Sequence, residues 1–543
     1  MSGRIADRIS WVICFCLFLA GVGTASLAAH FESVPGYMDA DYYYVTGREL
    51  FRGNGFSEPF LWNYLSSPNR LPAVSHTYWM PLSSLIVAAG MLLGGNENFP
   101  NGRMIFILLT GLIPVLSYCL AHQFGLGQRD RLFAGLFSIV PGFYLAYLPT
   151  TETFTPNMVL GGVFLLLVGW KPGVQRRWIR YGLWGVIVGG MHLTRTEGVL
   201  WILPCLFIIV WEHAKEDMLP PKMRIAYIIL AISVFSLGYL LVMGGWYYRN
   251  WAEFGRIFPP GGEKTLWLTV YEQTFLFPAN SLTFSNWWNS GLGPILGNRW
   301  RALITNLQTI LAVQGQIVLL PFMFVGLWQQ LRCRQVRVGT GMWLIVLGLM
   351  TLVFPFAGEN GGFFHAGSAI QILLWAVAPV GVSFVVDRLA WQFSWKKTNQ
   401  FLLFLLVILL ITCTLLTVYL FNRRVIGSVS GDRLWDRSAR HYQEIESILV
   451  ERGVKPGERV MVNNPPGYIM VSNRQSLVIP YGDERMLLSA ACQFQAVYLI
   501  LEATNPSQLG NLYHQEYNTS TFIFQFGLGT TKVYAIQCPE MEK

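Results

Sequence analysis

Four short polar segments between apolar stretches carry the side chains that could do chemistry. Asp39 and Asp41 stand two residues apart in Asp-Ala-Asp-Tyr-Tyr-Tyr, and Glu152 lies in a Thr- and Pro-rich loop. A third segment holds Arg195 together with Glu197, and a Gly-rich fourth holds His365 (all read from the printed sequence). Because ionisable groups near a membrane are costly to desolvate, a functional role is the first hypothesis for such residues.

Each segment also has a simpler interpretation. The two aspartates could be solvated loop residues or the N-cap of a following helix. Glu152 could belong to a hydrated connector, and Arg195 could pair only with Glu197. A single histidine such as His365 often makes structural hydrogen bonds instead of acting as a base or a ligand.

Taken together, these side chains predict group transfer from a lipid phosphate. A carboxylate can remove a proton from an acceptor hydroxyl, and a guanidinium can stabilise a departing phosphate. The sequence contains no G-x-S-x-G elbow, Walker loop or G-x-G-x-x-G fingerprint. We therefore expect an activated lipid-linked donor rather than ATP as the energy source.

The two first-loop acids are assigned different roles. The pattern Tyr44-Gly47-x-x-Leu50 predicts a helix that begins near Asp41, with Asp41 as its N-cap. Asp39 would then precede the helix and project into the site as the general base. On an extended loop both acids could face the same side, whereas within a helix they would point about 200° apart.

Composition places these residues in a membrane protein. The chain has 543 residues, of which 53% are hydrophobic and 13% charged, with a mean hydropathy of +0.41. Soluble domains contain about 25% charged residues, so an ordinary soluble protein is excluded. The net charge of +9 comes from basic residues clustered in short loops, which argues against a nucleic-acid partner.

The apolar segments predict eleven membrane spans, since about 20 helical residues cross the hydrocarbon. The expected spans are 9–29, 104–121, 132–149, 155–170, 179–192, 198–211, 225–247, 305–328, 341–357, 368–386 and 401–421. The run Met80–Leu93 is short and follows a proline turn, and counting it as a span would move every later basic loop outside. We expect it to lie flat or re-enter on the outer face.

The positive-inside rule then fixes the direction of the chain. The N-terminus is expected in the cytoplasm and the C-terminal part outside the plasma (inner) membrane. Three outer segments follow: 30–103, 248–304 and the part after Phe421. Residues 425–543 alternate strand and helix patterns and predict a soluble α/β domain, in which Cys492 and Cys538 could pair although nothing indicates it.

The first 200 residues contain four recognisable motifs: the acids of the first loop, Gly47-x-x-Leu50-x-x-Gly53-x-Gly55-Phe56, Tyr78-Trp79-Met80-Pro81-Leu82 and Gly102-Arg103. With these motifs the segment resembles the GT-C superfamily of polyprenyl-phosphate-sugar glycosyltransferases, in the branch of protein mannosyltransferases and the aminoarabinose transferase of lipid A. This resemblance implies a polytopic α-helical membrane protein, with residues 1–424 as the transmembrane glycosyltransferase module.

The resemblance also implies a reaction and roles for some residues. A polyprenyl-phosphate-sugar donor would glycosylate a lipid, glycan or protein hydroxyl at the outer face, among membrane lipids. Asp39 or Asp41 would be the first-loop acid that acts as base or binds a divalent metal, and Glu152 would match the second outer acid. Tyr43 and Tyr78 lie in the matching segments and are candidates for substrate binding, as are Arg195, Glu197 and His365, which lie outside the motifs.

Two departures from the family pattern concern this assignment. The segment Tyr78-Trp79-Met80-Pro81 has one proline where many members have two, and Ala40 separates the two acids that are usually adjacent.

Two other functions fit a polytopic protein, namely a transporter or flippase of lipid-linked glycans and a non-catalytic envelope-assembly protein. Transporters often show internal repeats with midplane sites, whereas here the halves differ and the polar residues lie in the loops.

Overall fold

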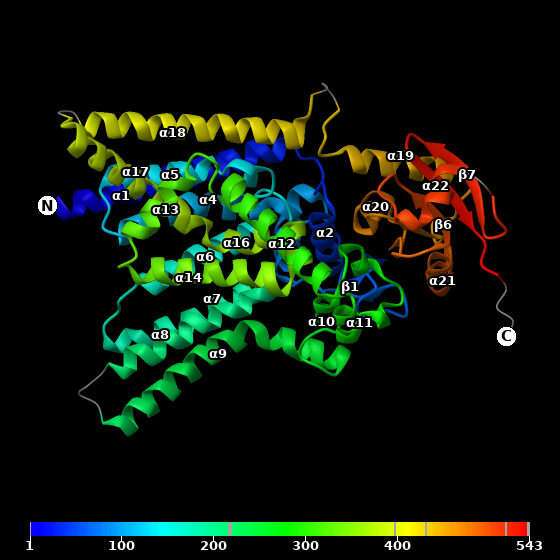
Figure 1. Cartoon of the computed structure of the whole chain (residues 1–543), viewed down its shortest axis with the longest axis horizontal. Coiled ribbons are helices and arrows are strands. Elements are labelled where there is room, and N and C mark those ends of the chain that lie inside the picture. The colour runs from blue at the N-terminus through cyan, green and yellow to red at the C-terminus, as the bar shows by residue number, and fades with distance from the viewer. Residues whose placement is uncertain (1, 216–219, 396–397, 429–431, 516–517, 540–543) are drawn as a thin grey trace.

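The computed structural model describes residues 2–215, 220–395, 398–428, 432–515 and 518–539. A bundle of long helices makes up most of the molecule, and a small sheet domain lies at the end opposite to the start of the first helix (Figure 1). The chain is therefore mainly helical with a small C-terminal α/β part, as its sequence predicts.

The helices follow the apolar segments. The first half contains α1 (Ser2–His30), α2 (Met38–Phe51), α3 (Leu82–Gly94), α4 (Phe99–Gln123), α5 (Gln128–Ile139), α6 (Phe154–Gly169), α7 (Arg177–Thr194), α8 (Ile202–Ala214) and α9 (Pro221–Phe254). The second half contains α10 (Gly261–Lys264), α11 (Phe284–Asn289), α12 (Leu292–Gln308), α13 (Leu320–Gln329), α14 (Arg334–Gly348), α15 (Pro355–Ala357), α16 (Phe363–Gly367), α17 (Gln371–Phe393) and α18 (Thr398–Phe421).

Among the described residues, seven helical segments are long and apolar enough to cross a membrane by length and composition. They are Ser10–His30, Phe99–Gln123, Thr196–Ala214, Pro221–Phe254, Arg334–Val353, Pro355–Phe393 and Thr398–Ile426. All eleven predicted spans fall on helical structure, but several are short or broken, for example 132–149, which α5 covers only up to Ile139. Eleven crossings remain a prediction.

Helix α3 covers the ambiguous run that begins at Met80. Its 13 residues extend about 20 Å, less than the ~30 Å of hydrocarbon that a spanning helix must cross. It packs between α2 and α4, with Val87 and Met91 fully buried. This length agrees with the expectation that the segment does not span.

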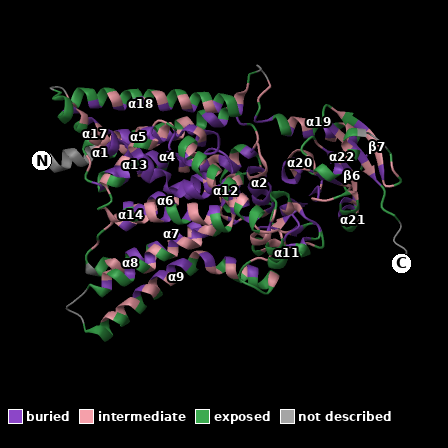
Figure 2. Cartoon of the chain, viewed as in Figure 1, coloured by how far each residue is buried: buried purple, intermediate pink, exposed green. Residues whose placement is uncertain are grey.

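The interior of the bundle is built around α17, whose residues from Gln371 to Gly381 are all buried. The outward sides of α9 and α18 are exposed instead (Figure 2). Leu241 is 80% and Leu415 66% exposed, although both are strongly apolar. Apolar side chains on the outside of a bundle are expected where lipid is the surrounding solvent.

The C-terminal part contains a six-stranded sheet in the order β2-β5-β4-β6-β8-β7. Its strands are β2 (Phe60–Leu61), β4 (Arg459–Val462), β5 (Ser476–Val478), β6 (Ala496–Leu501), β7 (Phe522–Leu528) and β8 (Thr531–Ile536). The strands β2, β5, β4 and β6 run parallel, while β8 pairs antiparallel with β6 and β7. The helices around the sheet are α19 (Arg437–Glu451), α20 (Pro465–Ser472), α21 (Glu484–Phe494) and α22 (Gly510–Gln515).

Two features of this sheet go beyond the sequence prediction. The strand β2 comes from the first outer loop and pairs with β5, with Phe60 opposite Ser476. A disulfide joins Cys492 at the end of α21 to Cys538 after β8. The first loop and the C-terminal part are thus joined through one sheet.

The start of α2 corrects the sequence prediction. The helix begins at Met38, not near Asp41, and its N-cap position is Tyr37 with no side-chain capping bond. Asp39 therefore lies inside the first turn, and Asp41 is a buried helical residue rather than a cap. Residues two apart in a helix point about 200° apart, so the two acids cannot face the same site.

Candidate active site

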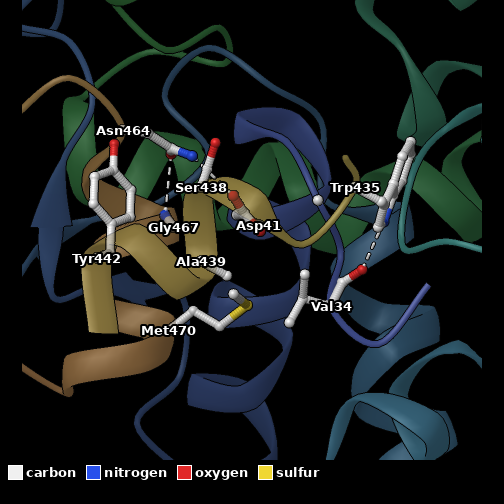
Figure 3. A pocket seen from close by; sticks show the side chains of 10 residues that line it. Val34, Asp41, Trp435, Ser438, Ala439, Tyr442, Asn464, Gly467 and Met470 are labelled. Carbon is white, nitrogen blue, oxygen red and sulfur yellow. Dashed lines mark hydrogen bonds between the residues drawn. The ribbon is translucent and has the colours of Figure 1, made fainter. Parts of the chain in front are cut away.

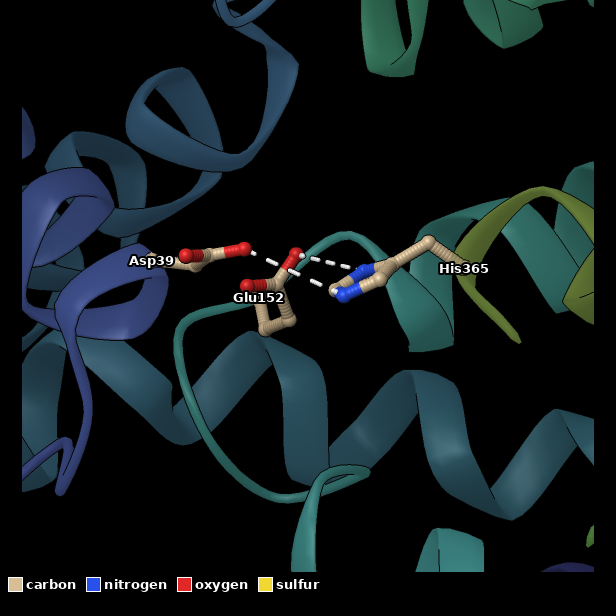
Figure 4. A group of neighbouring side chains, drawn as sticks. All are labelled: Asp39, Glu152 and His365. Carbon is tan, nitrogen blue, oxygen red and sulfur yellow. Dashed lines mark ion pairs between the residues drawn. The ribbon is translucent and has the colours of Figure 1, made fainter. Parts of the chain in front are cut away.

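Three segments that are far apart in sequence bring Asp39, Glu152 and His365 together (Figure 4). Asp39 is on the first turn of α2, Glu152 precedes α6, and His365 lies on α16. The His365 Nε2 atom is 3.9 Å from Asp39 Oδ2, and its Nδ1 atom is 3.6 Å from Glu152 Oε1. The two ring nitrogens therefore each face a carboxylate from a different element, and both carboxylates lie on the same side of the imidazole.

Glu152 is held in place by its neighbours along the chain. Its Oε1 atom accepts hydrogen bonds from the backbone N–H and the hydroxyl of Thr153, each at 2.6 Å. The Tyr37 hydroxyl donates to Oε2 at 3.5 Å. Its side chain is 1% exposed, so this carboxylate is almost completely removed from solvent.

The imidazole of His365 is oriented by α6. Its ring stacks on Phe154 with the ring centres 4.2 Å apart. The backbone carbonyl of His365 accepts hydrogen bonds from Asn157 Nδ2 at 3.2 Å and from Ser368 Oγ at 2.6 Å. The turn that carries the histidine is thereby fixed to the helix that follows Glu152.

Arg195 completes the cluster from a third direction. It lies between α7 and a 3₁₀ turn, Thr196–Trp201, and forms an ion pair with Glu197. Its Nη1 atom also donates to Thr153 Oγ1 at 3.4 Å, which places the guanidinium beside Glu152. The pairing with Glu197 and the position in the cluster are both present, so neither interpretation of Arg195 excludes the other.

Tyr43 and Tyr78 lie within electrostatic reach of the same groups. Burial raises the pKa of Tyr43 well above its usual range, and Glu152 raises it further. Burial also raises the pKa of Tyr78 to about 12, with Arg195 and Asp39 close enough to influence it. Both phenols stay protonated near neutral pH and can donate hydrogen bonds.

Asp41 lies apart from this cluster. It is 3% exposed, and its Oδ2 atom accepts a hydrogen bond from Asn464 Nδ2 at 2.9 Å. A small cleft between α2 and the C-terminal part surrounds it (Figure 3). The structure thus separates the two first-loop acids, one toward the cluster and one toward α20.

The two acids of the cluster differ in their affinity for protons. Burial and the nearby carboxylate of Glu152 raise the pKa of Asp39 to about 7, against the opposing effects of His365 and Arg195. Burial would also raise the pKa of Glu152, but the nearby His365 and the hydrogen bonds from Thr153 hold it below its usual value. Two neighbouring acids whose pKa values are pushed apart can divide proton exchange and permanent charge between them.

The same three side chains also fit a divalent metal. Asp39, Glu152 and His365 each offer one ligand atom, and these atoms lie within 4.8 Å of one another. Two carboxylate oxygens and one imidazole nitrogen form a donor set that suits zinc or manganese. The family resemblance leaves the metal unknown, with Asp39 and Glu152 as possible ligands, and His365 is an addition from the geometry.

Two residues at the site were not predicted from the sequence. Thr153 contacts Glu152, His365 and Arg195 through its hydroxyl. Tyr37 reaches Glu152 from the segment before α2. Thr153 could have been predicted from the sequence because it directly follows an acid. The direction of the Tyr37 side chain depends on how the loops pack, so it could not.

Comparisons with known proteins bear on the family and the fold of the chain. The family model of dolichyl-phosphate-mannose-protein mannosyltransferases matches residues 75–239. The structure of ArnT from Cupriavidus metallidurans bound to undecaprenyl phosphate is similar over 98% of both chains, at 12% identity and a TM-score of 0.58. No curated protein sequence matches the chain.

An archaeal enzyme has a similar structure. The oligosaccharyltransferase of Archaeoglobus fulgidus in complex with Zn and sulfate matches at 14% identity with a TM-score of 0.57, covering 91% of this chain and 69% of the other. The same archaeal protein with an inhibitory peptide and a dolichol-phosphate matches with a TM-score of 0.53 at 12% identity, over 91% and 69% of the two chains. The resemblance predicted from the sequence is confirmed: the chain is a multi-pass membrane protein with the GT-C glycosyltransferase fold.

Proposed function

We propose that the protein transfers a sugar from a polyprenyl-phosphate-linked donor to a hydroxyl of a lipid, glycan or protein at the outer face of the membrane. The family match and the fold support a membrane glycosyltransferase. The observation that carries the proposal is the convergence of Asp39, Glu152, His365 and Arg195 at one point. Similar folds have been solved with undecaprenyl phosphate and with dolichol-phosphate, which supports a donor of this class.

The proposed reaction is a single displacement at the anomeric carbon. The acceptor oxygen forms a bond to that carbon while the bond between the carbon and the phosphate oxygen breaks. The proton of the acceptor hydroxyl passes to Asp39, and polyprenyl phosphate leaves with the bonding electron pair. Attack from the side opposite to the phosphate inverts the anomeric configuration.

The geometry suggests a role for each side chain. Asp39 is the general base, because its pKa of about 7 lies close to the working pH and its side chain is 31% exposed. Arg195 binds the donor phosphate, since a guanidinium offers paired donors to phosphate oxygens. Tyr43 and Tyr78 donate hydrogen bonds to the substrates, and Glu197 orients Arg195 through their ion pair.

A divalent metal is an alternative to the role of Asp39 as a base, because a carboxylate bound to a cation would not take up the proton of the acceptor. Asp39, Glu152 and His365 would hold it, and the Zn in the archaeal oligosaccharyltransferase complex supports this proposal. A bound cation would supply positive charge that stabilises the departing phosphate. Thr153 and Phe154 hold His365 and Glu152 in their relative positions whether or not a metal is bound.

We propose a cytoplasmic N-terminus and an extracytoplasmic C-terminal domain. Basic residues gather in the loops on the N-terminal side, as the positive-inside rule requires. The disulfide between Cys492 and Cys538 supports an oxidising compartment for the domain. A C-terminal fusion to alkaline phosphatase should be active, and an inactive fusion with a fluorescent cytosolic reporter would contradict the orientation.

We propose that the chain divides into a transmembrane module, residues 1–424, and a C-terminal domain, residues 425–543. The sheet of this domain also includes a strand from the module. The outer loop 30–103 supplies β2 to the domain's sheet, while 248–304 contributes Leu276, which bridges to Tyr481. The domain is therefore expected to fold in contact with both outer loops.

The proposed function is tested with purified protein in lipid nanodiscs. A panel of radiolabelled polyprenyl-phosphate sugars is compared with the corresponding nucleotide sugars, with a membrane extract as the source of acceptors. We expect label to move to an acceptor from at least one lipid-linked donor, with release of equimolar polyprenyl phosphate. Transfer from nucleotide sugars alone, or movement of intact donor across a bilayer without cleavage, would contradict the proposal.

A further inference from the structure

The first turn of α2 is fixed to three different parts of the molecule by three consecutive residues. Asp39 points to the cluster with Glu152 and His365. The Ala40 carbonyl accepts a hydrogen bond from Thr151 Oγ1 at 2.8 Å, next to Glu152 in sequence. Asp41 accepts the hydrogen bond from Asn464 at 2.9 Å. A shift of any one of these contacts would move the other two, because they share one helical turn.

The contact between Asp41 and the C-terminal domain is closely packed. Asn464 caps α20 by accepting a hydrogen bond from the Gly467 N–H at 3.1 Å, and it uses its amide nitrogen for Asp41. A Cβ atom on Gly467 would lie 2.8 Å from Asp41 Oδ2, so only glycine leaves room for the carboxylate there. Figure 3 shows Asp41 beside Asn464 and Gly467 at the beginning of α20.

A second set of contacts holds the segment that leads into α2. The Trp435 indole donates to the Val34 carbonyl at 2.9 Å, and Ser33 donates to Asp436 Oδ2 at 2.8 Å. Gly36 has a φ of +94° and faces the Trp435 ring so closely that a Cβ would lie 2.3 Å from it. The first residues of the C-terminal part thus pack against the segment that leads into α2, the helix that carries Asp39.

We propose that Asn464 is a positioning residue: through its hydrogen bond to Asp41 it sets the place of Asp39, so the C-terminal domain controls the geometry of the transfer site. This inference rests on the proposed function, and it assigns Asp41 to the same positioning role. Neither residue touches the substrates. Because a displacement of about 1 Å at a reacting group can lower a rate about 10²-fold, the effect of losing this hydrogen bond is measurable.

The test uses the full-length protein in nanodiscs with Asn464→Asp. Aspartate keeps the shape and the oxygen that caps α20, but it replaces the donor to Asp41 with an acceptor. We expect kcat to fall about 10²-fold at an unchanged donor KM, with a lower Tm because two buried carboxylates then lie side by side. The exchanged pair Asp41→Asn with Asn464→Asp restores a donor and an acceptor, and it should recover most of the lost kcat.

A matched control lies one residue away. Asn463 donates to the Thr504 carbonyl at 2.9 Å and to its hydroxyl at 3.0 Å, both within the C-terminal domain. Asn463→Ala should therefore leave kcat unchanged. Equal losses of kcat and Tm in Asn463→Ala and Asn464→Asp would overturn the proposal, as would an exchanged pair that stays as slow as Asn464→Asp.

Hydrogen exchange of the α2 amides separates this inference from the proposed function, since it needs no substrate. We expect faster exchange across Met38–Phe51 in Asn464→Asp, and wild-type exchange in the exchanged pair and in Asn463→Ala. Unchanged exchange in Asn464→Asp would overturn the positioning role. Wild-type protein that transfers no sugar would refute the proposed function, while the exchange comparison would still decide whether Asn464 holds α2.

Discussion

Two clusters of charged residues in this protein are built in opposite ways. At the end of the bundle away from the sheet domain, in what we call the inner cluster, Glu212 on α8 forms ion pairs with Arg180 and Arg334 and accepts a hydrogen bond from the Tyr181 hydroxyl at 2.9 Å. Each carboxylate oxygen of Glu212 has a close donor. The outer cluster around Asp39 combines three acids, one arginine and one histidine. Arg195 pairs closely with Glu197 there, whereas His365 lies 3.6 and 3.9 Å from its two carboxylates.

The cations of the inner cluster make further hydrogen bonds, although Arg180 Nε is buried without a partner among the described residues. Arg334 donates to the Val168 carbonyl at 3.0 and 2.7 Å, and Arg180 donates to the Trp170 carbonyl at 2.9 Å. These bonds join α6, α7, α8 and α14. A network with so many close donors and acceptors has little capacity left for a substrate, so its role is structural.

The outer cluster is less completely paired. His365 lies 3.6 and 3.9 Å from the two carboxylates, beyond the ~3.2 Å limit of an N–H···O hydrogen bond. Asp39 is partly exposed, whereas Glu152 is buried. Buried acids with different proton affinities and open contacts are typical of a reaction site. The comparison teaches that the completeness of pairing, more than the presence of charge, separates the two roles.

The largest effect is expected at Asp39. Asp39→Asn is nearly isosteric and removes the proton acceptor, so turnover should fall about 10²–10⁴-fold with no loss of Tm. Asp41→Asn should keep measurable activity, because its amide oxygen can still accept the hydrogen bond from Asn464. Initial rates and thermal unfolding of both variants check this, and the opposite pattern would exchange the two roles.

The next effect concerns donor binding by Arg195. Arg195→Lys keeps the charge but loses the paired donors, and we expect the affinity for polyprenyl phosphate to fall about 10- to 100-fold. Binding of labelled polyprenyl phosphate to nanodisc protein measures this. If Arg195→Ala binds as tightly as wild type, Arg195 serves only as the partner of Glu197.

At the inner cluster the expected effect is on stability. Glu212→Gln leaves Arg180 and Arg334 without their carboxylate, which should destabilise the fold by about 1–3 kcal/mol and lower Tm. Turnover of Glu212→Gln, measured below its Tm, should equal that of the wild type. Glu97→Gln is the matched control, because its ion pair with Arg52 leaves Glu97 42% exposed and contributes at most about 1 kcal/mol. Equal Tm values for Glu212→Gln and Glu97→Gln would contradict the structural role.

The last effect depends on pH and concerns Glu58, a buried acid between α2 and α3 with Arg249 nearby. Burial raises the pKa of Glu58 from 4.5 to about 8, although Tyr42 and Arg249 oppose the shift. The folded protein therefore keeps this proton longer than the unfolded chain, and the stability it contributes is lost as the pH rises from 4.5 to about 8.

Glu58→Gln removes this titration. Its Tm should exceed that of the wild type at pH 8, and the difference should shrink toward pH 5. Thermal unfolding at both pH values checks the expectation. Parallel Tm curves for the two proteins would show that Glu58 does not titrate in this range.

Much of the outer cluster could be predicted from the sequence because its members contrast with their surroundings. Asp39, Glu152, Arg195 and His365 each stand in a short polar segment between apolar runs. The helices around them could be predicted from the lengths of the apolar segments and from the charges of the loops. The sequence pattern was sufficient to predict a site residue wherever a single segment contains both that residue and the element that carries it.

Features that join distant segments could not be predicted in this way. The partner of Asp41 lies 423 residues away, and β2 pairs with a strand of the C-terminal domain. The start of α2 at Met38 instead of Asp41 depends on packing against α3 and α20, which overrides the local capping preference of aspartate. The relative orientation of Asp39 and Asp41 therefore had to come from the structure.

The most direct test of the central claim is the rate at which purified protein in nanodiscs releases polyprenyl phosphate from a labelled polyprenyl-phosphate sugar. Wild type, Asp39→Asn and Glu212→Gln are compared at one temperature at which all three are folded. We predict wild-type release by Glu212→Gln and only background release by Asp39→Asn. Release by Asp39→Asn at the wild-type rate would contradict the assignment of sugar transfer to the outer cluster.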